Sequence, residues 1–385
     1  MTATGGQEEA KLRPLVGFLG PKASYSHQAT LQSFPEEQWD LTPLVTIPDI
    51  FAAVQAGDVA YGVIPFENST NGSVVFSLDC FSDRDGLYPD IAVCAEIYLD
   101  VHHYLVGRLP PSSASIAAST GVVPATGFVP SYPAEDNAGS GTRTPTVSEP
   151  HPPTPRARPR ADLSHIRRLY SHPQAWGQCT AFLSTYLKGV EAVDVTSTSR
   201  AAELVAADPT GTSAAVSSAV AAQLHGIDVL AECIEDRPDN TTRFFVLRNE
   251  SLASSTSSPG GVVGRNGPMP RREVPAGPGS HPSTTGDGDG GRTKSLVSFT
   301  VPHEAPGALA DVLGCFRRFE LNLTSINSRP SLVKPFQYVF FVEFRGHKFR
   351  DPEGRVKGVL EAVGKVAETW RWLGSWDDQR AVGLS

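Results

Sequence analysis

A chain of 385 residues is long enough for two or three domains, and its 40% hydrophobic content is ample for packed cores. The formal net charge of −8 and the lack of a basic stripe argue against nucleic-acid binding. Five scattered cysteines form no C-x-x-C pair, no histidine has metal-ligand spacing, and no window is apolar enough for a membrane span. We therefore expect a reduced, cytoplasmic protein without metal and without membrane attachment. Residues 1–13 carry no apolar run, which predicts a tail and neither a signal peptide nor a transit peptide.

The first elements read as an α/β pattern. Residues 15–19 are predicted as a buried strand, followed by a turn at Gly20-Pro21 and a helix through residue 34 that Ser24 or Ser26 caps. Tyr25 lies in the same turn. Backbone N–H groups gathered at such a turn can hold an anion, and an ordinary helix cap is the compatible alternative.

A polar loop follows the next strand. Residues 47–56 predict a helix and 61–65 a strand, after which Glu67, Asn68 and Ser69 precede a helix over 74–81. In open α/β sheets, ligands bind at strand ends of this kind. These three residues are predicted to form a recognition loop, or alternatively plain turn residues with a cap.

Composition changes abruptly after strands at 91–97 and 101–106. From about 110 to 162 the chain is rich in Ser, Thr, Pro, Ala and Gly and ends in a basic run. Such a segment cannot bury enough apolar surface to offset its ordering entropy. We expect a disordered insertion here.

The pattern resumes with a polar helix start. Pro173 suits a first helical position, which places Ser171 and Gln174 at the positive N-terminus of a helix reaching residue 187. Further strands and helices alternate after it, at 193–196, 199–207, 214–218, 219–225 and 229–233.

A turn leads directly into a predicted strand over 244–247. Thr242 and Arg243 lie at its N-terminal end, and Phe244 is its first apolar residue. Thr242 offers a hydroxyl, and Arg243 offers a planar fork that suits a carboxylate. The alternative is a strand start with a solvated arginine.

The C-terminal part reads as a separate module. Residues 250–293 are dense in Gly, Pro, Ser and Thr, which predicts a flexible linker. Residues 294–378 follow in the order βαββαβ, which is typical of a ferredoxin-like sandwich.

Taken together, these stretches resemble the prephenate dehydratase family. The motifs are GPKASYS at 20–26, IPFENSTNGSV at 64–74, SHPQAWGQC at 171–179 and NTTRF at 240–244. The C-terminal module is similar to the family's regulatory ACT domain, with GAL at 307–309 and NSRP at 327–330. The resemblance extends over residues 15–249 and this module.

The resemblance implies a catalytic domain over 14–249 built of two α/β lobes, like type II periplasmic binding proteins, with the site between them. It implies conversion of prephenate into phenylpyruvate, water and carbon dioxide without a cofactor or metal. Thr242 would lie beside the leaving hydroxyl, and Glu67, if buried, would be the competing proton source. The expected substrate-binding residues are Ser24, Tyr25, Asn68, Ser69, Ser171, Gln174, Arg243 and Phe244.

The resemblance also implies control by L-phenylalanine and a homodimer or homotetramer. The effector would be held by Gly307, Ala308, Leu309, Asn327, Ser328 and Arg329. Asn327 stands where the family has glutamate, which removes a charge that could pair with an amino group. Two other functions stay open: arogenate dehydratase, the same chemistry on an amino-bearing substrate, and a non-catalytic amino-acid sensor.

Overall fold

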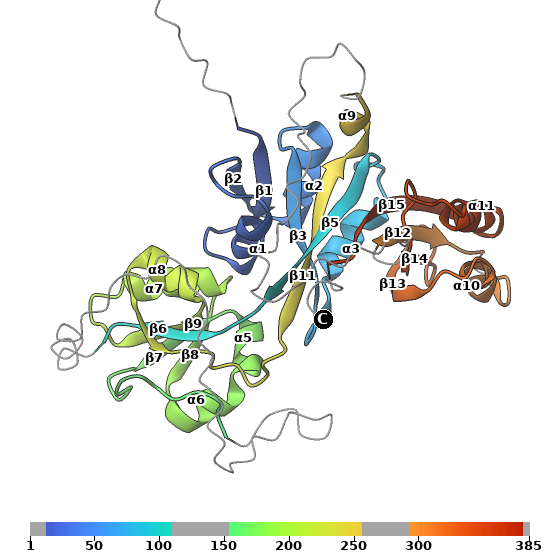
Figure 1. Cartoon of the computed structure of the whole chain (residues 1–385). Helices are drawn as coiled ribbons and strands as arrows, with labels where there is room; N and C mark the ends of the chain where they lie inside the picture. The colour runs from blue at the N-terminus through green and yellow to red at the C-terminus, as the bar shows by residue number, and fades with distance from the viewer. Residues whose placement is uncertain (1–12, 110–153, 256–292, 303, 380–385) are drawn as a thin grey trace, which may run out of the picture. The chain divides into compact units, whose positions relative to one another are not determined.

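The computed structural model describes residues 13–109, 154–255, 293–302 and 304–379 (Figure 1). They form two compact units. The first combines the chain up to Gly20, Ser26–Leu99 and everything from Thr241 on; the second combines Pro21–Tyr25 with Asp100–Asn240. Almost all of the predicted tail, most of the predicted insertion and most of the predicted linker lie outside the described residues.

One sheet runs through the first unit, in the order β13-β14-β12-β15-β5-β11-β3-β1-β2, with β4 paired to β3. Its N-terminal strands are parallel at β1, β2 and β3, whereas β11 runs antiparallel to β3 (Figure 1). The elements are β1 (Leu15–Leu19), α1 (Tyr25–Ser33), β2 (Asp40–Leu44), α2 (Ile47–Ala56), β3 (Tyr61–Asn68), β4 (Gly72–Ser73), α3 (Val75–Ser82), β5 (Ile91–Asp100), β11 (Thr241–Asn249) and α9 (Glu250–Ser255).

Helix α2 shows how local sequence sets these boundaries. Thr46 and Asp49 form a reciprocal capping box at its start, and Gly57 ends it in the left-handed conformation at φ 78°. Ile50 and Val54, one turn apart, are both buried against the sheet. The predicted bounds of α2, residues 47–56, are confirmed.

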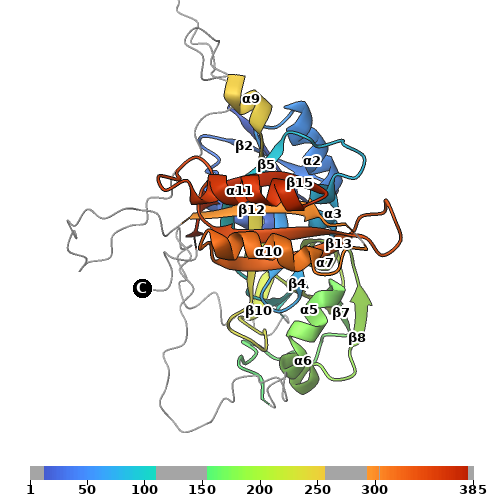
Figure 2. The same ribbon diagram turned by 90° about the vertical axis from the view of Figure 1, so that its right-hand side faces the viewer.

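The C-terminal module has the predicted ferredoxin-like order, with strands arranged β13-β14-β12-β15. Helices α10 and α11 lie side by side against these strands (Figure 2). Its elements are β12 (Thr293–Thr300), α10 (Ala308–Arg318), β13 (Leu323–Pro330), β14 (Tyr338–Arg345), α11 (Arg355–Val366) and β15 (Thr369–Asp377).

The module is not the independent body that we expected. Successive residues of a strand point to opposite faces, so Val297 packs under α10 and α11 while Leu296 points the other way. Leu296 belongs to the core that contains Phe245 and Phe81, together with Phe341, Leu373 and Trp376 of the module. Strand β15 also runs parallel to β5, paired at Gly374 and Val93. The C-terminal module therefore completes the core of the first unit.

The second unit is a five-stranded sheet in the order β10-β6-β9-β7-β8 (Figure 1). Small side chains such as Ala201, Ala215 and Ala222 let helices α7 and α8 approach it closely. Its elements are β6 (Tyr104–Gly107), β7 (Arg168–Ser171), α5 (Pro173–Gln178), α6 (Thr180–Tyr186), β8 (Glu191–Asp194), α7 (Thr198–Ala206), β9 (Ser213–Ser217), α8 (Ala219–His225) and β10 (Asp228–Ala231).

Two predicted segments differ from the structure. The helix expected from 173 to 187 breaks at Cys179, because the Asp236 carboxylate accepts hydrogen bonds from the N–H groups of Thr180 and Ala181, both at 3.0 Å, and so starts a new helix. The expected insertion also ends earlier than predicted. Arg160, which closes its basic run, is bonded to the second unit, because its N–H donates to the Leu230 carbonyl at 2.7 Å. Within the described ranges, no helix combines the length and the hydropathy that crossing a membrane requires.

Candidate active site

Strands β3 and β11 bring the predicted catalytic residues together in the first unit. Their register places Thr242 opposite Asn68 and Arg243 opposite Glu67, and it shifts between Arg243 and Phe244. Bulges of this kind re-aim side chains and are common beside functional sites. Two polar pairs therefore face each other across the ends of two strands.

Asn68 is held by its own turn and orients Thr242. Its Oδ1 accepts hydrogen bonds from the N–H groups of Thr70 at 3.0 Å and Asn71 at 2.9 Å. Its Nδ2 donates to Thr242 Oγ1 at 3.0 Å. Because the threonine oxygen accepts this bond, the threonine proton is directed to another acceptor. Ser69 anchors the same strand end, since its Oγ accepts from the N–H of Thr241 at 3.0 Å.

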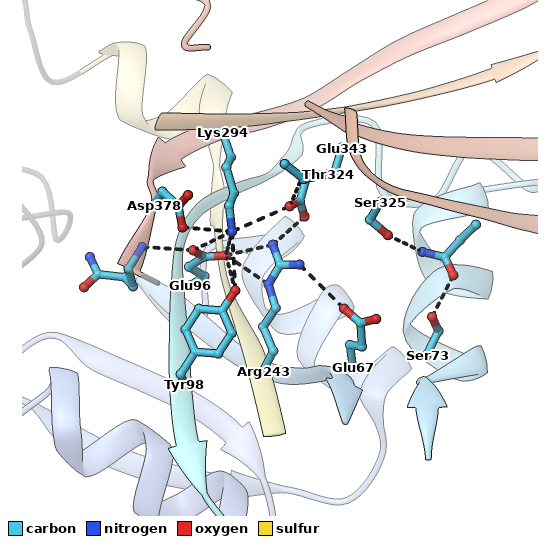
Figure 3. Close-up of polar contacts among 12 residues, drawn as sticks. Glu67, Ser73, Glu96, Tyr98, Arg243, Lys294, Thr324, Ser325, Glu343 and Asp378 are labelled. Atoms are coloured by element: carbon cyan, nitrogen blue, oxygen red, sulfur yellow. Dashed lines mark hydrogen bonds and ion pairs between the residues drawn. The ribbon is translucent and has the colours of Figure 1, made fainter. Parts of the chain in front are cut away.

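Arg243 differs from its predicted role as a partner of a substrate carboxylate. Its guanidinium is buried and pairs with protein carboxylates, those of Glu96 at 2.7 Å and of Glu343 (Figure 3). Burial lowers the pKa of Arg243, but the charges of Glu343 and Glu96 outweigh it and raise the pKa. The guanidinium also lies over the Phe245 ring, 4.7 Å from its centroid. The guanidinium is therefore occupied by protein carboxylates and not, as predicted, placed for direct contact with a substrate carboxylate.

Glu67 and Phe244 also differ from expectation. The Glu67 side chain is 39% exposed, so the burial that would have made it a competing proton source is not present. Its Oε2 lies 3.7 Å from the NH1 of Arg243. Phe244 is fully buried, which makes it a core side chain instead of a substrate contact.

Four predicted substrate residues belong to the second unit: Ser24, Tyr25, Ser171 and Gln174. The Tyr25 hydroxyl donates to the His102 carbonyl at 3.0 Å, and burial raises its pKa well above the usual value. Ser171 is fully buried and donates to the Val216 carbonyl at 2.8 Å, so its hydroxyl is structural. Gln174 is exposed at the start of α5, and Ser24 is half-buried just before α1.

One group in the described part of the chain has the side chains of a metal site. His102, Cys233 and Glu235 place their ligand atoms within 4.8 Å of one another. Hydrogen bonds with Cys233 and Glu235 raise the pKa of His102 to about 10, and its Nδ1 lies 3.0 Å from Glu235. Without a metal this group is an ion pair of His102 with Glu235, and a metal ion would have to displace the imidazole proton.

The predicted effector residues separate into two places. Gly307, Ala308 and Leu309 line a pocket of about 220 Å³ at the start of α10, whose walls also include Phe336 and Tyr338. The three residues from the NSRP motif do not line it. Asn327 accepts a hydrogen bond from Ser73 at 2.6 Å, Arg329 pairs with both oxygens of Asp79 in α3, and Ser328 is exposed. Part of the predicted effector motif thus joins the module to the N-terminal strands and helices.

Sequence reasoning missed Glu96, Lys294 and Glu343, which surround Arg243. A signal for them exists. Glu96 and Glu343 each stand alone inside a strand of apolar residues, and a charge in such a run needs a buried partner. Nothing in the local sequence says which partner.

The fold and the site define a class: a two-unit α/β protein with an oriented threonine at a strand end and a C-terminal ferredoxin-like module. The family model for prephenate dehydratase matches residues 16–120 and 156–252, more than half of the chain. The protein belongs to the prephenate dehydratase family.

Similar proteins agree with this membership. A bifunctional chorismate mutase/prephenate dehydratase of Pseudomonas aeruginosa is 31% identical over 94% of this chain and 72% of its own length. A probable prephenate dehydratase of Saccharomyces cerevisiae is 28% identical over 93% and 95%. Among solved structures, prephenate dehydratase from Arthrobacter aurescens in complex with L-Phe has a TM-score of 0.65 at 23% identity, covering 95% of this chain and 90% of its own. GqqA, described as a quorum quenching acylase, has a TM-score of 0.62 at 22% identity and covers 96% and 100%. The two solved structures, at 23% and 22% identity, are evidence of a shared fold.

Proposed function

We propose that the protein is a prephenate dehydratase that converts prephenate into phenylpyruvate, water and carbon dioxide for phenylalanine biosynthesis. The observation that carries the proposal is the Thr242 hydroxyl, oriented by Asn68 at a strand end beside Glu67. Family membership supports the choice of substrate.

The reaction needs one proton and one well-placed donor. As the bond to the ring carboxylate breaks, its electron pair enters the ring and the carboxylate leaves as carbon dioxide. The same electron shift expels the ring hydroxyl, which departs as water with a proton from Thr242, and solvent replaces that proton. Aromatisation of the ring drives the step, and the protein contributes positioning and stabilisation of the leaving oxygen.

The remaining polar groups have supporting roles in this proposal. Glu67 lies next along the strand pair and reaches solvent, so its proposed role is to exchange protons with water and not to be the buried proton source that we expected. Asn68 and Ser69 fix the strand end that carries Thr242. Gln174 and Ser24 of the second unit are the proposed contacts for substrate carboxylates.

An assay of phenylpyruvate formation from prephenate tests the proposal. We expect turnover by the wild-type protein and a kcat lower by about 10²–10³-fold in Thr242→Ala, because a donor used in the transition state is lost. Thr242→Ser keeps a hydroxyl and should retain more activity. Thr241→Ala is the matched control, since its side chain points to the other face of the strand and should leave kcat nearly unchanged.

The other outcomes are equally informative. Faster turnover of arogenate than of prephenate would make the protein an arogenate dehydratase. Binding of phenylalanine without turnover of either substrate would make it a sensor. Wild-type kcat in Thr242→Ala would contradict the mechanism.

We also propose feedback control by L-phenylalanine at the pocket lined by Gly307, Ala308 and Leu309. The pocket is smaller than those that hold drug-sized ligands, which suits a single amino acid. The exposed apolar loop with Leu332, Val333 and Phe336 borders it and supports pairing of modules in a dimer or tetramer. Five unpaired cysteines support a reducing, cytoplasmic setting.

A further inference from the structure

The side chains around Arg243 form a buried ion cluster that links the C-terminal module to the strand bearing Thr242 (Figure 3). Two cations, Arg243 and Lys294, face the carboxylates of Glu96 and Glu343. All four side chains are nearly inaccessible, with exposed fractions of 7%, 4%, 0% and 2% respectively.

The cluster is fully connected by direct contacts. Glu96 accepts from Arg243 Nε at 2.9 Å and from Lys294 Nζ at 3.1 Å. Glu343 pairs with the NH2 of Arg243, and its other oxygen accepts from Thr324 Oγ1 at 2.7 Å. Lys294 also pairs with Asp378 at 3.0 Å. Glu343 and Glu96 both pair with the NH2 of Arg243, so removing the charge of Glu343 takes away one side of this pairing and draws the guanidinium toward the carboxylates that stay, those of Glu96 and Glu67.

The guanidinium lies on the opposite face of the strand from the Thr242 hydroxyl, but it contacts the strand end that carries this threonine. Arg243 follows Thr242 directly and is paired in register with Glu67, toward which its NH1 points at 3.7 Å (Figure 3). Glu343 holds the opposite edge of the same planar group. A shift of the guanidinium therefore changes both the setting of Glu67 and the strand end that presents Thr242.

We propose that Glu343, on strand β14 of the C-terminal module, is a positioning residue for the dehydration step, acting through Arg243 on Glu67 and Thr242. The inference rests on the proposed function. It gives the module a part in basal catalysis, in addition to any part in control by an effector.

Kinetics of the full-length protein test the proposal. We expect Glu343→Gln to lower kcat on the order of tenfold to a hundredfold with a much smaller change in KM, because displacement of positioned groups costs rate. Glu343→Asp restores the charge and should recover part of kcat. Ser295→Ala is the control: it lies buried on β12 beside Lys294 but bonds only outside the cluster, so it should lower Tm and leave kcat unchanged.

A double-mutant cycle separates positioning from general destabilisation. If Glu343 acts through Arg243 on Glu67 as well as on Thr242, the effect of Glu343→Gln on kcat should be clearly smaller in a Glu67→Gln background than in the wild-type protein. Equal fold losses in both backgrounds would overturn the proposal, as would a loss of kcat in Ser295→Ala that matches the one in Glu343→Gln.

Failure of Glu343→Gln to fold does not end the test. Thr324→Val removes only the hydrogen bond to Glu343 and leaves every charge in place, so we expect a folded protein with kcat lowered about threefold. Wild-type kcat in both Thr324→Val and Glu343→Asp would overturn the proposal. Absence of turnover in the wild-type protein would instead contradict the proposed function itself.

Discussion

Asn68 connects the turn after β3 to the hydroxyl of Thr242 through the two ends of one amide group. Its oxygen accepts from two backbone N–H groups of the turn, and its nitrogen donates to the threonine. Because the turn fixes the amide, the nitrogen points at Thr242 without a further loss of side-chain entropy.

The two ends of that amide can be separated by one substitution. Asn68→Asp keeps the acceptor oxygen for the turn but places a second acceptor against Thr242 Oγ1. We expect kcat to fall by about tenfold, which corresponds to about 1.4 kcal/mol and is within the range of one hydrogen bond, with Tm within a few degrees of wild type. Asn68→Ala should lower both. A loss of Tm in Asn68→Asp equal to that in Asn68→Ala would show that the amide serves the turn alone.

His102 makes the stability of the protein depend on pH. Hydrogen bonds with Cys233 and Glu235 raise its folded-state pKa from 6.5 to about 10. A raised pKa stabilises the protein fully below pH 6.5, and this contribution is lost as the pH rises toward 10. The buried Tyr25 and Cys179, whose pKa values are also raised, add their own losses only at higher pH.

We therefore expect the free energy of unfolding to decrease steadily between about pH 7 and 9. Urea titrations at several pH values measure it, and His102→Gln should flatten the dependence over this range. A free energy of unfolding that stays level or rises in the wild-type protein would contradict the ion pair with Glu235.

At the scale of elements, strand β15 meets β5 at one glycine. Gly374 has φ 140°, a conformation that other residues rarely adopt, and an added Cβ would clash with the backbone oxygen of Val93. We expect Gly374→Ala to lower the free energy of unfolding by at least about 2 kcal/mol in urea titrations.

Gly314 provides a matched control in the same module. It lies within helix α10, and nothing within 4 Å would meet an added Cβ. Gly314→Ala should raise the free energy of unfolding by about 0.5–1 kcal/mol. Similar effects of the two substitutions would mean that β15 and β5 do not approach as described.

Strand β13 and helix α3 are joined by a bidentate ion pair between Arg329 and Asp79. Arg329 donates to both oxygens of Asp79, at 2.9 and 3.0 Å, and Arg84 also pairs with Asp79 at 2.8 Å. This ion pair joins the proposed effector module to helix α3. It can transmit effector binding to α3 only if its geometry differs between the effector-free and the effector-bound protein.

We expect Asp79→Asn to raise the phenylalanine concentration for half-maximal inhibition about threefold or more, with kcat in the absence of phenylalanine unchanged. The measurement is prephenate turnover over a phenylalanine titration. Glu361→Gln, on the exposed face of α11, is the control and should leave inhibition as in wild type. Unchanged inhibition in Asp79→Asn would exclude this ion pair from the regulation.

At the scale of the whole molecule, the elements were predictable where the signal is local. The capping box and Gly57 fix α2 from a dozen residues, and the apolar runs of β1 and β11 are read directly from the sequence. The order βαββαβ followed from periodicity in the same way. Strand β4 has two residues and no pattern of its own, and it exists because β3 offers a partner.

The candidate site was predictable in its residue types and less so in their roles. Resemblance to the family's motifs pointed to Thr242, Asn68 and Glu67, which the structure does bring together. It could not show that Arg243 is already paired, because its partners come from positions 96 and 343 and meet it only through the tertiary fold. Long-range ion pairs leave no periodic trace in a sequence.

The shared core has a consequence for synthesis on the ribosome. When the first 250 residues have emerged, Phe245 and Phe81 still lack the covering side chains of Leu296, Phe341, Leu373 and Trp376. Arg243 has by then emerged without Glu343. The first unit therefore cannot finish folding until Trp376 has emerged, and its unfinished apolar face is open to aggregation or chaperone capture in the meantime. A gene that ends within the linker, before residue 293, should accordingly yield an aggregation-prone polypeptide with little soluble protein, and not a compact enzyme that has lost its regulation.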